Sequence, residues 1–297
     1  MFQLNIALIN WIFPHTIISS RVHLCTYCME EGGVRYHLVN PGHSLSRAIL
    51  ERGIPGGCRF SVEETAYGAT RDSLGSLLEL FADALTHPMM PHADDDRLVM
   101  IYYNTPPRHD KDHQNIVIDI DENIADYCPE DINISITDML SIQPLDGTNA
   151  CMDTWFERAR SGEESPSAQS GYYWCSAQDV AEALLRAFPF MTPGLEPYTV
   201  SGRRYWPSKD TWTEIKLLAD RTLAGQSGQF ELKHLLDDGG PAVEVEVLDG
   251  RGTRRQRPNI SRFHELLEEN TGEGWNPRTP LRQSLMLLLA EWVAEQS

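Results

Sequence analysis

The stretch that decides the fold lies near the end of the chain and reads Arg257-Pro-Asn-Ile-Ser-Arg-Phe-His-Glu-Leu-Leu, followed by Gly274-Trp-Asn-Pro-Arg-Thr-Pro-Leu. Residues 261–269 and 280–294, on either side of the Gly-Trp-x-Pro motif, are predicted to be helices that close the chain. This closure is the most specific short motif in the sequence, and the other segments are interpreted outward from it.

The first half of the chain alternates strand-like and helix-like patterns. Short apolar runs bounded by turn signals such as Asn40-Pro-Gly predict buried strands. The predicted strands are residues 5–9, 34–39, 58–62, 98–103 and 132–136, and the predicted helices are residues 17–29, 44–52, 73–85 and 115–127. Such alternation predicts a parallel sheet with helices on both faces. We therefore expect residues 1–140 to form a Rossmann-like α/β domain.

The pattern changes after about residue 140. Helices are predicted over residues 151–160, 177–188 and 210–223, a strand over 198–200, and a half-exposed strand over 243–248. We expect residues 141–297 to form mostly a smaller C-terminal substrate lobe, interleaved with the sheet.

Four further segments point to a known family by their order and spacing. They read Ile134-Ser-Ile-Thr-Asp-Met-Leu-Ser-Ile-Gln-Pro, Trp155-Phe-Glu-Arg-Ala-Arg-Ser-Gly-Glu, Tyr172-Tyr-Trp-Cys-Ser-Ala-Gln-Asp-Val-Ala and Tyr198-Thr-Val-Ser-Gly. Together with the Gly-Trp-x-Pro closure, they resemble the extended short-chain dehydrogenase/reductase (SDR) superfamily, whose members include NAD-dependent epimerases and dehydratases. The resemblance implies a Rossmann-like sheet, a substrate lobe and, in many members, a homodimer formed through a helix pair.

The glycine-rich cofactor loop of that family is missing from the expected place. After the predicted first strand the chain reads Asn10-Trp-Ile-Phe-Pro-His-Thr-Ile-Ile-Ser-Ser, which contains no glycine. Glycines are needed there because only a bare backbone lets a pyrophosphate sit on the helix N-terminus. The strand predicted second, residues 34–39, ends in Asn40 rather than in the acid that the family uses to bind the adenosine ribose.

The family's catalytic pair, a Tyr with a Lys four residues later, is missing as well. Aligned back from Glu122 and Tyr127, its position falls in residues 113–119, which contain neither residue type. We therefore predict that no nicotinamide cofactor is used and that hydride chemistry is lost. Binding of NAD or NADP through a divergent loop is the alternative.

Candidate catalytic residues follow from this frame. His15 lies in the predicted cofactor groove and can donate or accept a proton, and Tyr103 and Asn104 lie at a strand's carboxyl end, where such sheets place active-site groups. The candidate substrate-binding residues are Trp11, Phe13, Tyr102, Thr105, Arg203 and Trp206. Each of these residues also has a purely structural explanation. The aromatic residues Trp11 and Phe13 would fill a cofactor groove that is no longer used, and the two tyrosines would pack within the sheet. Arg203 would be exposed to solvent beside a packed Trp206.

The function predicted from the residues is binding of a small organic molecule in the cleft between the lobes, followed by a non-redox cyclisation, isomerisation or elimination. Two alternatives stay open. One is a genuine NAD(P)-dependent epimerase, dehydratase or reductase, and the other is a non-catalytic binding or regulatory protein.

The amino-acid composition argues against some classes of binding partner. The 297-residue chain carries a formal net charge of −18 with a pI near 4.9, which argues against nucleic acid or an anionic membrane as partner. The apolar N-terminal residues 1–15 are interrupted and too short to cross a bilayer. Six scattered cysteines indicate reduced thiols in a cytoplasm, with no metal site. A homodimer is compatible with these features.

Overall fold

The computed structural model describes residues 34–87, 97–103, 113–120, 127–141, 150–164, 171–228, 231 and 255–295. The predicted elements at residues 5–9, 17–29 and 243–248 lie outside these ranges.

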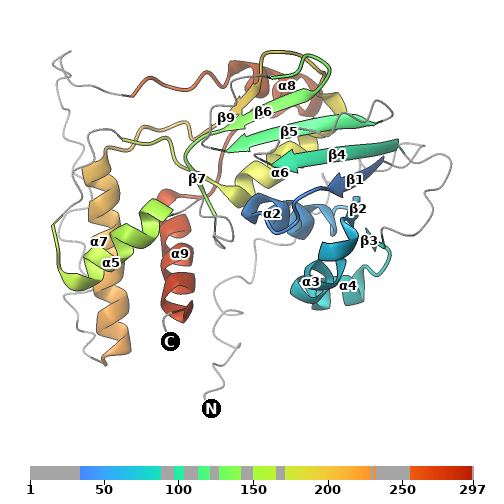
Figure 1. The fold of residues 1–297 in the computed structure, drawn as a ribbon. Coiled ribbons are helices and arrows are strands. Elements are labelled where there is room, and N and C mark those ends of the chain that lie inside the picture. The colour runs from blue at the N-terminus through green and yellow to red at the C-terminus, as the bar shows by residue number, and fades with distance from the viewer. Residues whose placement is uncertain are drawn as a thin grey trace.

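Seven parallel strands form the main sheet, in the order β3-β2-β1-β4-β5-β6-β9 (Figure 1). The strands are β1 (Val34–Leu38), β2 (Arg59–Val62), β3 (Leu85–Thr86), β4 (Arg97–Tyr103), β5 (Gln114–Ile120), β6 (Ile132–Ile136) and β9 (Tyr198–Val200). Every pairing within the sheet is parallel. The predicted Rossmann-like α/β fold is therefore confirmed.

Side chains alternate between the two faces of the sheet. In β5, Ile116, Ile118 and Ile120 belong to the main hydrophobic core, whereas the alternate residues Asn115, Val117 and Asp119 are buried outside that core. Helices α2 (Ser44–Gly53) and α6 (Ala177–Ala187) pack against each other and supply the same core.

One predicted helix is wrong. Residues 115–127 were expected to be helical, but Gln114–Ile120 is strand β5 and pairs with both β4 and β6. The isoleucines recur every second residue, which is the strand period rather than the helical one. As a result, only residues 104–113 separate β4 from β5, and only residues 121–131 separate β5 from β6. Both segments are shorter than the dozen or more residues that usually connect two parallel strands.

The single helix predicted over residues 73–85 is also wrong, because these residues belong to the end of one helix, a second short helix and the start of a strand. Helix α3 (Glu64–Leu74) ends at Gly75, whose φ of 43° lies in the left-handed region, and α4 (Ser76–Leu80) follows. Leu85 belongs to β3. Leu80 in α4 is 79% exposed.

A smaller lobe packs around a second hydrophobic cluster. Helices α5 (Ala150–Ser161), α7 (Ser208–Gln226) and α9 (Leu281–Glu295) lie side by side, away from the main sheet (Figure 1). Their cluster includes Trp155, Trp212 and Leu285.

Two short elements and one helix connect this lobe to the sheet. Strands β7 (Met139–Leu140) and β8 (Cys175–Ser176) form a two-stranded parallel sheet next to the lobe. Helix α8 (Ser261–Thr271) packs on α6 and β9 at the edge of the main sheet.

Candidate functional site

The loop after β1 differs from the loop predicted from the sequence. Strand β1 lies between β2 and β4, so the family's cofactor loop corresponds to residues 39–43 and the start of α2. The prediction had placed this loop at residues 10–20, because it counted residues 5–9 as the first strand. The actual segment reads Val39-Asn-Pro-Gly-His-Ser-Leu-Ser46 and contains a single glycine.

His43 fills the N-terminus of α2. Its imidazole is buried, and the Nδ1 atom accepts a hydrogen bond from the backbone N–H of Leu45 at 3.1 Å. The ring also stacks on Tyr103, with centroids 4.9 Å apart and planes 8° apart. Ser46 is fully buried and donates to the carbonyl of Asn40 at 2.8 Å.

These contacts do not fit a dinucleotide. A pyrophosphate needs free amides and bare backbone at the start of the helix, whereas here an imidazole accepts from one of those amides and side chains occupy the adjacent space. Burial raises the pKa of the Tyr103 phenol, partly offset by a hydrogen bond with Ser46, so Tyr103 stays protonated at neutral pH.

An acidic residue does follow the second strand. Strand β2, which pairs with β1, takes the place that the prediction gave to residues 34–39, and it is followed directly by Glu63 and Glu64. The conclusion drawn from Asn40 is therefore wrong, because Asn40 follows the first strand of the sheet. This is the one feature of the region that matches a ribose-binding pattern.

Tyr102 and Tyr103 are both buried at the carboxyl end of β4. This burial favours packing over direct contact with a ligand. His15, Asn104, Trp11, Phe13 and Thr105 lie outside the described residues, and their roles stay predictions.

Arg203 and Trp206 come together in a pocket of about 200 Å³, which we call the arginine pocket. The sequence predicted these two residues, but not the others that line the pocket: Leu140, Trp174, Cys175, Ser176, Arg204, Asn276, Pro277, Thr279, Pro280, Leu281 and Ser284. The Gly-Trp-x-Pro closure was the available signal for the last six, since it precedes α9 directly.

Two backbone segments are held together to form one wall. Tyr172 and Trp206 exchange backbone hydrogen bonds of 2.9 and 2.8 Å, and the Gly202 N–H donates to the Tyr173 carbonyl at 2.7 Å. A Cβ atom at Gly202 would lie 2.1 Å from the carbonyl oxygen of Trp174. Only glycine fits at this approach, and it directs Arg203 and Trp206 into the pocket.

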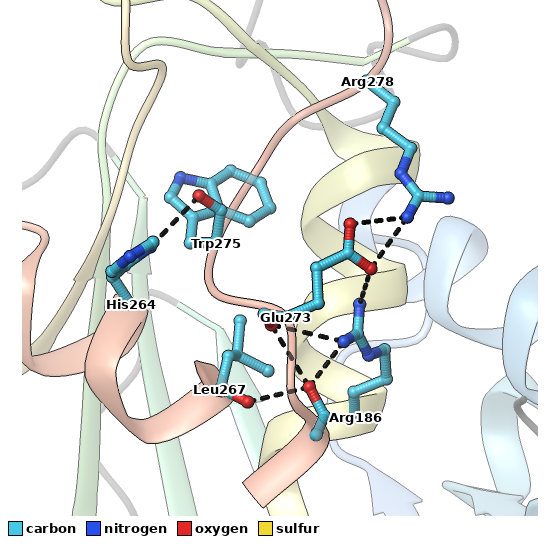
Figure 2. Close-up of polar contacts among 7 residues, drawn as sticks. Arg186, His264, Leu267, Glu273, Trp275 and Arg278 are labelled. Carbon is cyan, nitrogen blue, oxygen red and sulfur yellow. Dashed lines mark hydrogen bonds and ion pairs between the residues drawn. The ribbon is translucent and has the colours of Figure 1, made fainter. Parts of the chain in front are cut away.

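Polar contacts hold the closing segment against α6 and α8 (Figure 2). The carboxylate of Glu273 accepts from Arg278 at 2.7 and 2.8 Å, and it forms an ion pair of 3.8 Å with Arg186 of α6. The Trp275 carbonyl lies 3.3 Å from the Nδ1 atom of His264 in α8.

Two further sets of hydrogen bonds hold this closing segment, one made by the Trp275 indole and one by the Asp179 carboxylate. The Trp275 indole is 2% exposed and donates to the carbonyl of Ser201 at 2.7 Å. The carboxylate of Asp179 in α6 accepts from the backbone N–H of Thr279 at 2.8 Å and from its hydroxyl at 3.0 Å. Asp179 thereby aligns the start of α9 with the arginine pocket.

Asp138 combines burial with an unusual backbone conformation. It follows β6, is the one non-glycine residue with positive φ (56°) in the part of the chain that the structure describes, and is 5% exposed. Its carboxylate accepts from the Tyr173 N–H at 2.7 Å and from Arg255 at 2.6 Å. Burial raises the pKa of the nearby Tyr172, and the charges of Cys151 and Asp138 add to the rise.

The described ranges contain no helix that could cross a membrane, and no cluster of three or more His, Cys, Asp or Glu side chains arranged to hold a metal ion.

No protein-family model and no curated protein sequence matches the chain, but solved structures share its fold. The terminal R domain of the myxalamid PKS-NRPS pathway is 9% identical over 90% of this chain and 92% of its own, with a TM-score of 0.54. The reductase domain of the aureusimine biosynthetic cluster is 9% identical over 99% and 100%, with a TM-score of 0.51. A thiolation-reductase di-domain from an archaeal non-ribosomal peptide synthetase is 10% identical over 90% of this chain and 76% of its own, with a TM-score of 0.52.

At these identities the likeness concerns the fold alone. The chain shares the fold of these reductase domains, and this fold is the one that its motifs predicted.

Proposed function

We propose that this SDR-like protein binds a small organic molecule in the arginine pocket and does so without a nicotinamide cofactor. The observation that carries the proposal is the position of His43, whose imidazole caps α2 where a pyrophosphate would have to bind. The pocket, by contrast, combines arginine, tryptophan and hydroxyl side chains around an open volume.

The side chains that line this pocket favour ligand binding without proton transfer. Its described lining residues include no carboxylate and no imidazole, which are the usual general acids and bases. A non-catalytic role in binding or regulation is therefore the reading that we favour.

A non-redox cyclisation, isomerisation or elimination is the second candidate, and Asp138 favours it. Residues held at positive φ without being glycine gather at functional sites, and the carboxyl ends of parallel strands are where such sheets place them. His15 and Asn104 would be the further groups for this chemistry, as predicted from the sequence.

The experiment is a thermal-shift measurement with NAD, NADH, NADP and NADPH, combined with mass spectrometry of molecules that co-purify with the protein. We expect no shift with any dinucleotide and a retained small molecule of another class. A clear stabilisation by a dinucleotide, or its retention, would instead support a divergent cofactor site that uses Glu63, and would overturn the proposal.

A matched variant makes this test sharper. His43→Gly removes the imidazole from the start of α2, and Arg71→Gln changes an exposed residue on α3. If dinucleotide binding appears only with His43→Gly, the side chain itself is what blocks the site. Conversion of the retained molecule during incubation with the protein would separate the catalytic candidate from simple binding.

A further inference from the structure

We propose that the ligand of the arginine pocket is a small, planar, aromatic anion, with its carboxylate or phosphate held by Arg203 and Arg204. This inference rests on the proposed function, because it names the chemical class of the molecule bound there.

The charge of the pocket is opposite to the charge of the protein. The whole chain carries a formal charge of −18, yet the walls contain two arginines and, among the described lining residues, no acid. Arg203 lies 3.5 Å from the Trp275 carbonyl, and the Arg204 guanidinium lies over the Trp206 ring, 4.1 Å from its centroid. Neither arginine has a carboxylate partner within the described part of the chain, so both can bind an anion.

The aromatic walls are held in fixed orientations. The Trp174 ring stacks on Tyr172, with centroids 4.2 Å apart and planes 16° apart, and its indole N–H donates to the Thr211 hydroxyl at 3.1 Å. The backbone of Trp206 is paired with that of Tyr172, and its ring packs against the Arg204 guanidinium. Two tryptophans held in place favour a flat ligand over a flexible aliphatic one, because little side-chain freedom is lost on binding.

The start of a long helix adds positive potential to the same pocket. Pro280, directly before α9, and Leu281 and Ser284 at the start of α9 line it, and the N-terminus of a helix carries a partial positive charge. Asp179 positions this helix start through its two hydrogen bonds to Thr279. The helix supports the anion site that the two arginines define.

The volume limits the size of the ligand. At about 200 Å³, the pocket is smaller than the roughly 300–1,000 Å³ that drug-sized ligands occupy. A single aromatic ring with one acidic group suits this space, whereas an intact nucleotide sugar does not. A neighbouring pocket of about 180 Å³ shares Leu140, Ser176, Thr279 and Ser284, and it leaves room for a short substituent on the ring.

The test uses isothermal titration of the full-length protein with benzoate, phenyl phosphate, benzamide, cyclohexanecarboxylate and inorganic phosphate. We expect binding of benzoate, phenyl phosphate or both, with benzamide and cyclohexanecarboxylate weaker by about tenfold or more. The ratio between benzoate and phenyl phosphate distinguishes a carboxylate site from a phosphate site. Benzamide binding as tightly as both anions, or inorganic phosphate binding as tightly as phenyl phosphate, would overturn the inference.

Variants assign the binding to the pocket. Arg203→Gln and Arg204→Gln should each weaken the better anion by about tenfold, whereas Arg71→Gln on α3 should leave it unchanged. Trp206→Leu should remove the preference for benzoate over cyclohexanecarboxylate while keeping the preference for charge. Unchanged affinity in both arginine variants, with their circular dichroism spectra intact, contradicts the assignment.

The failure of this inference can be told apart from the failure of the proposed function. Asn276→Trp places a large ring on an exposed part of the pocket wall. If a neutral retained molecule binds and Asn276→Trp blocks it, the pocket is the site but the ligand class is wrong. If no probe binds and no molecule is retained, the proposed function fails together with this inference.

Discussion

The imidazole of His43 stacks on the phenol ring of Tyr103, with centroids 4.9 Å apart and planes 8° apart, at the carboxyl ends of β1 and β4. The N-cap residue of α2, the helix that follows β1, therefore packs on the last residue of the neighbouring strand β4, at the place where such folds receive a dinucleotide. The first consequence concerns stability, because the His43 imidazole both caps α2 and packs on Tyr103.

We expect His43→Ala to lower the free energy of unfolding by about 1–3 kcal/mol, through the lost helix cap and the space left beside Tyr103. His43→Asn is the matched variant, because asparagine keeps the cap and removes only the stacked ring. Urea denaturation should place it between the wild type and His43→Ala. Equal stability of all three proteins would show that neither contact contributes.

The raised pKa of Tyr103 predicts a loss of stability at alkaline pH. The phenol is kept neutral by burial, so its contribution is complete below its ordinary pKa of about 10 and decreases as the pH rises above that value. Urea denaturation at pH 8 and pH 10.5 should therefore show a smaller loss of stability in Tyr103→Phe than in the wild type. A parallel loss in both proteins would assign the effect to other groups.

Substitution of glycine by alanine should have opposite effects on stability at Gly202 and Gly225. A Cβ atom at Gly202 would lie 2.1 Å from the Trp174 carbonyl oxygen, whereas a Cβ atom at Gly225 in α7 meets nothing within 4 Å. Gly202→Ala should lower the free energy of unfolding by about 1–3 kcal/mol or prevent folding, and Gly225→Ala should raise it by about 0.5–1 kcal/mol. Thermal unfolding of the two variants checks both signs.

We expect the hydrogen bond of the Trp275 indole to stabilise the fold independently of the volume of its ring. In Trp275→Phe the Ser201 carbonyl loses its donor while most of the buried ring remains, so the free energy of unfolding should fall by about 1–3 kcal/mol. Trp292→Phe is the control, because its described contacts are with Phe156 and Arg160 and involve the ring rather than a hydrogen bond. A similar effect in both variants would mean that ring volume, not the hydrogen bond, is responsible.

Asp179 links the fold to the pocket. Asp179→Ala removes both hydrogen bonds to Thr279, and we expect it to weaken binding of benzoate or phenyl phosphate by a few-fold and to lower the melting temperature. Asp72→Ala removes an exposed acid from α3 and should do neither. Unchanged binding in Asp179→Ala would mean that the start of α9 is held by other contacts.

Local patterns in the sequence predicted many of the elements. The runs at residues 34–39, 58–62, 98–103 and 132–136 are strands of the sheet, because short apolar runs between turn signals are sufficient to identify buried strands. The helix predicted over residues 115–127 failed because an alternating stretch was assigned the wrong period.

The candidate site was predicted less well. Arg203 and Trp206 do share a pocket, but Trp174, Ser176 and Thr279 join them only through the fold, from positions far apart in the chain. The hydrogen bonds that assemble them, such as the one between the Gly202 N–H and the Tyr173 carbonyl, leave no periodic signal in the sequence.

By itself, the sequence determined the class of fold, the acidic net charge and the closure at Gly274-Trp-Asn-Pro, because these depend on local periodicity, composition and a short motif. Only the tertiary structure decided that β1, residues 34–38, lies between β2 and β4, that His43 caps the helix that follows it, and that two arginines line a pocket. The reason is physical: strand order and the walls of a pocket arise from contacts between distant segments, and many different side chains can satisfy them.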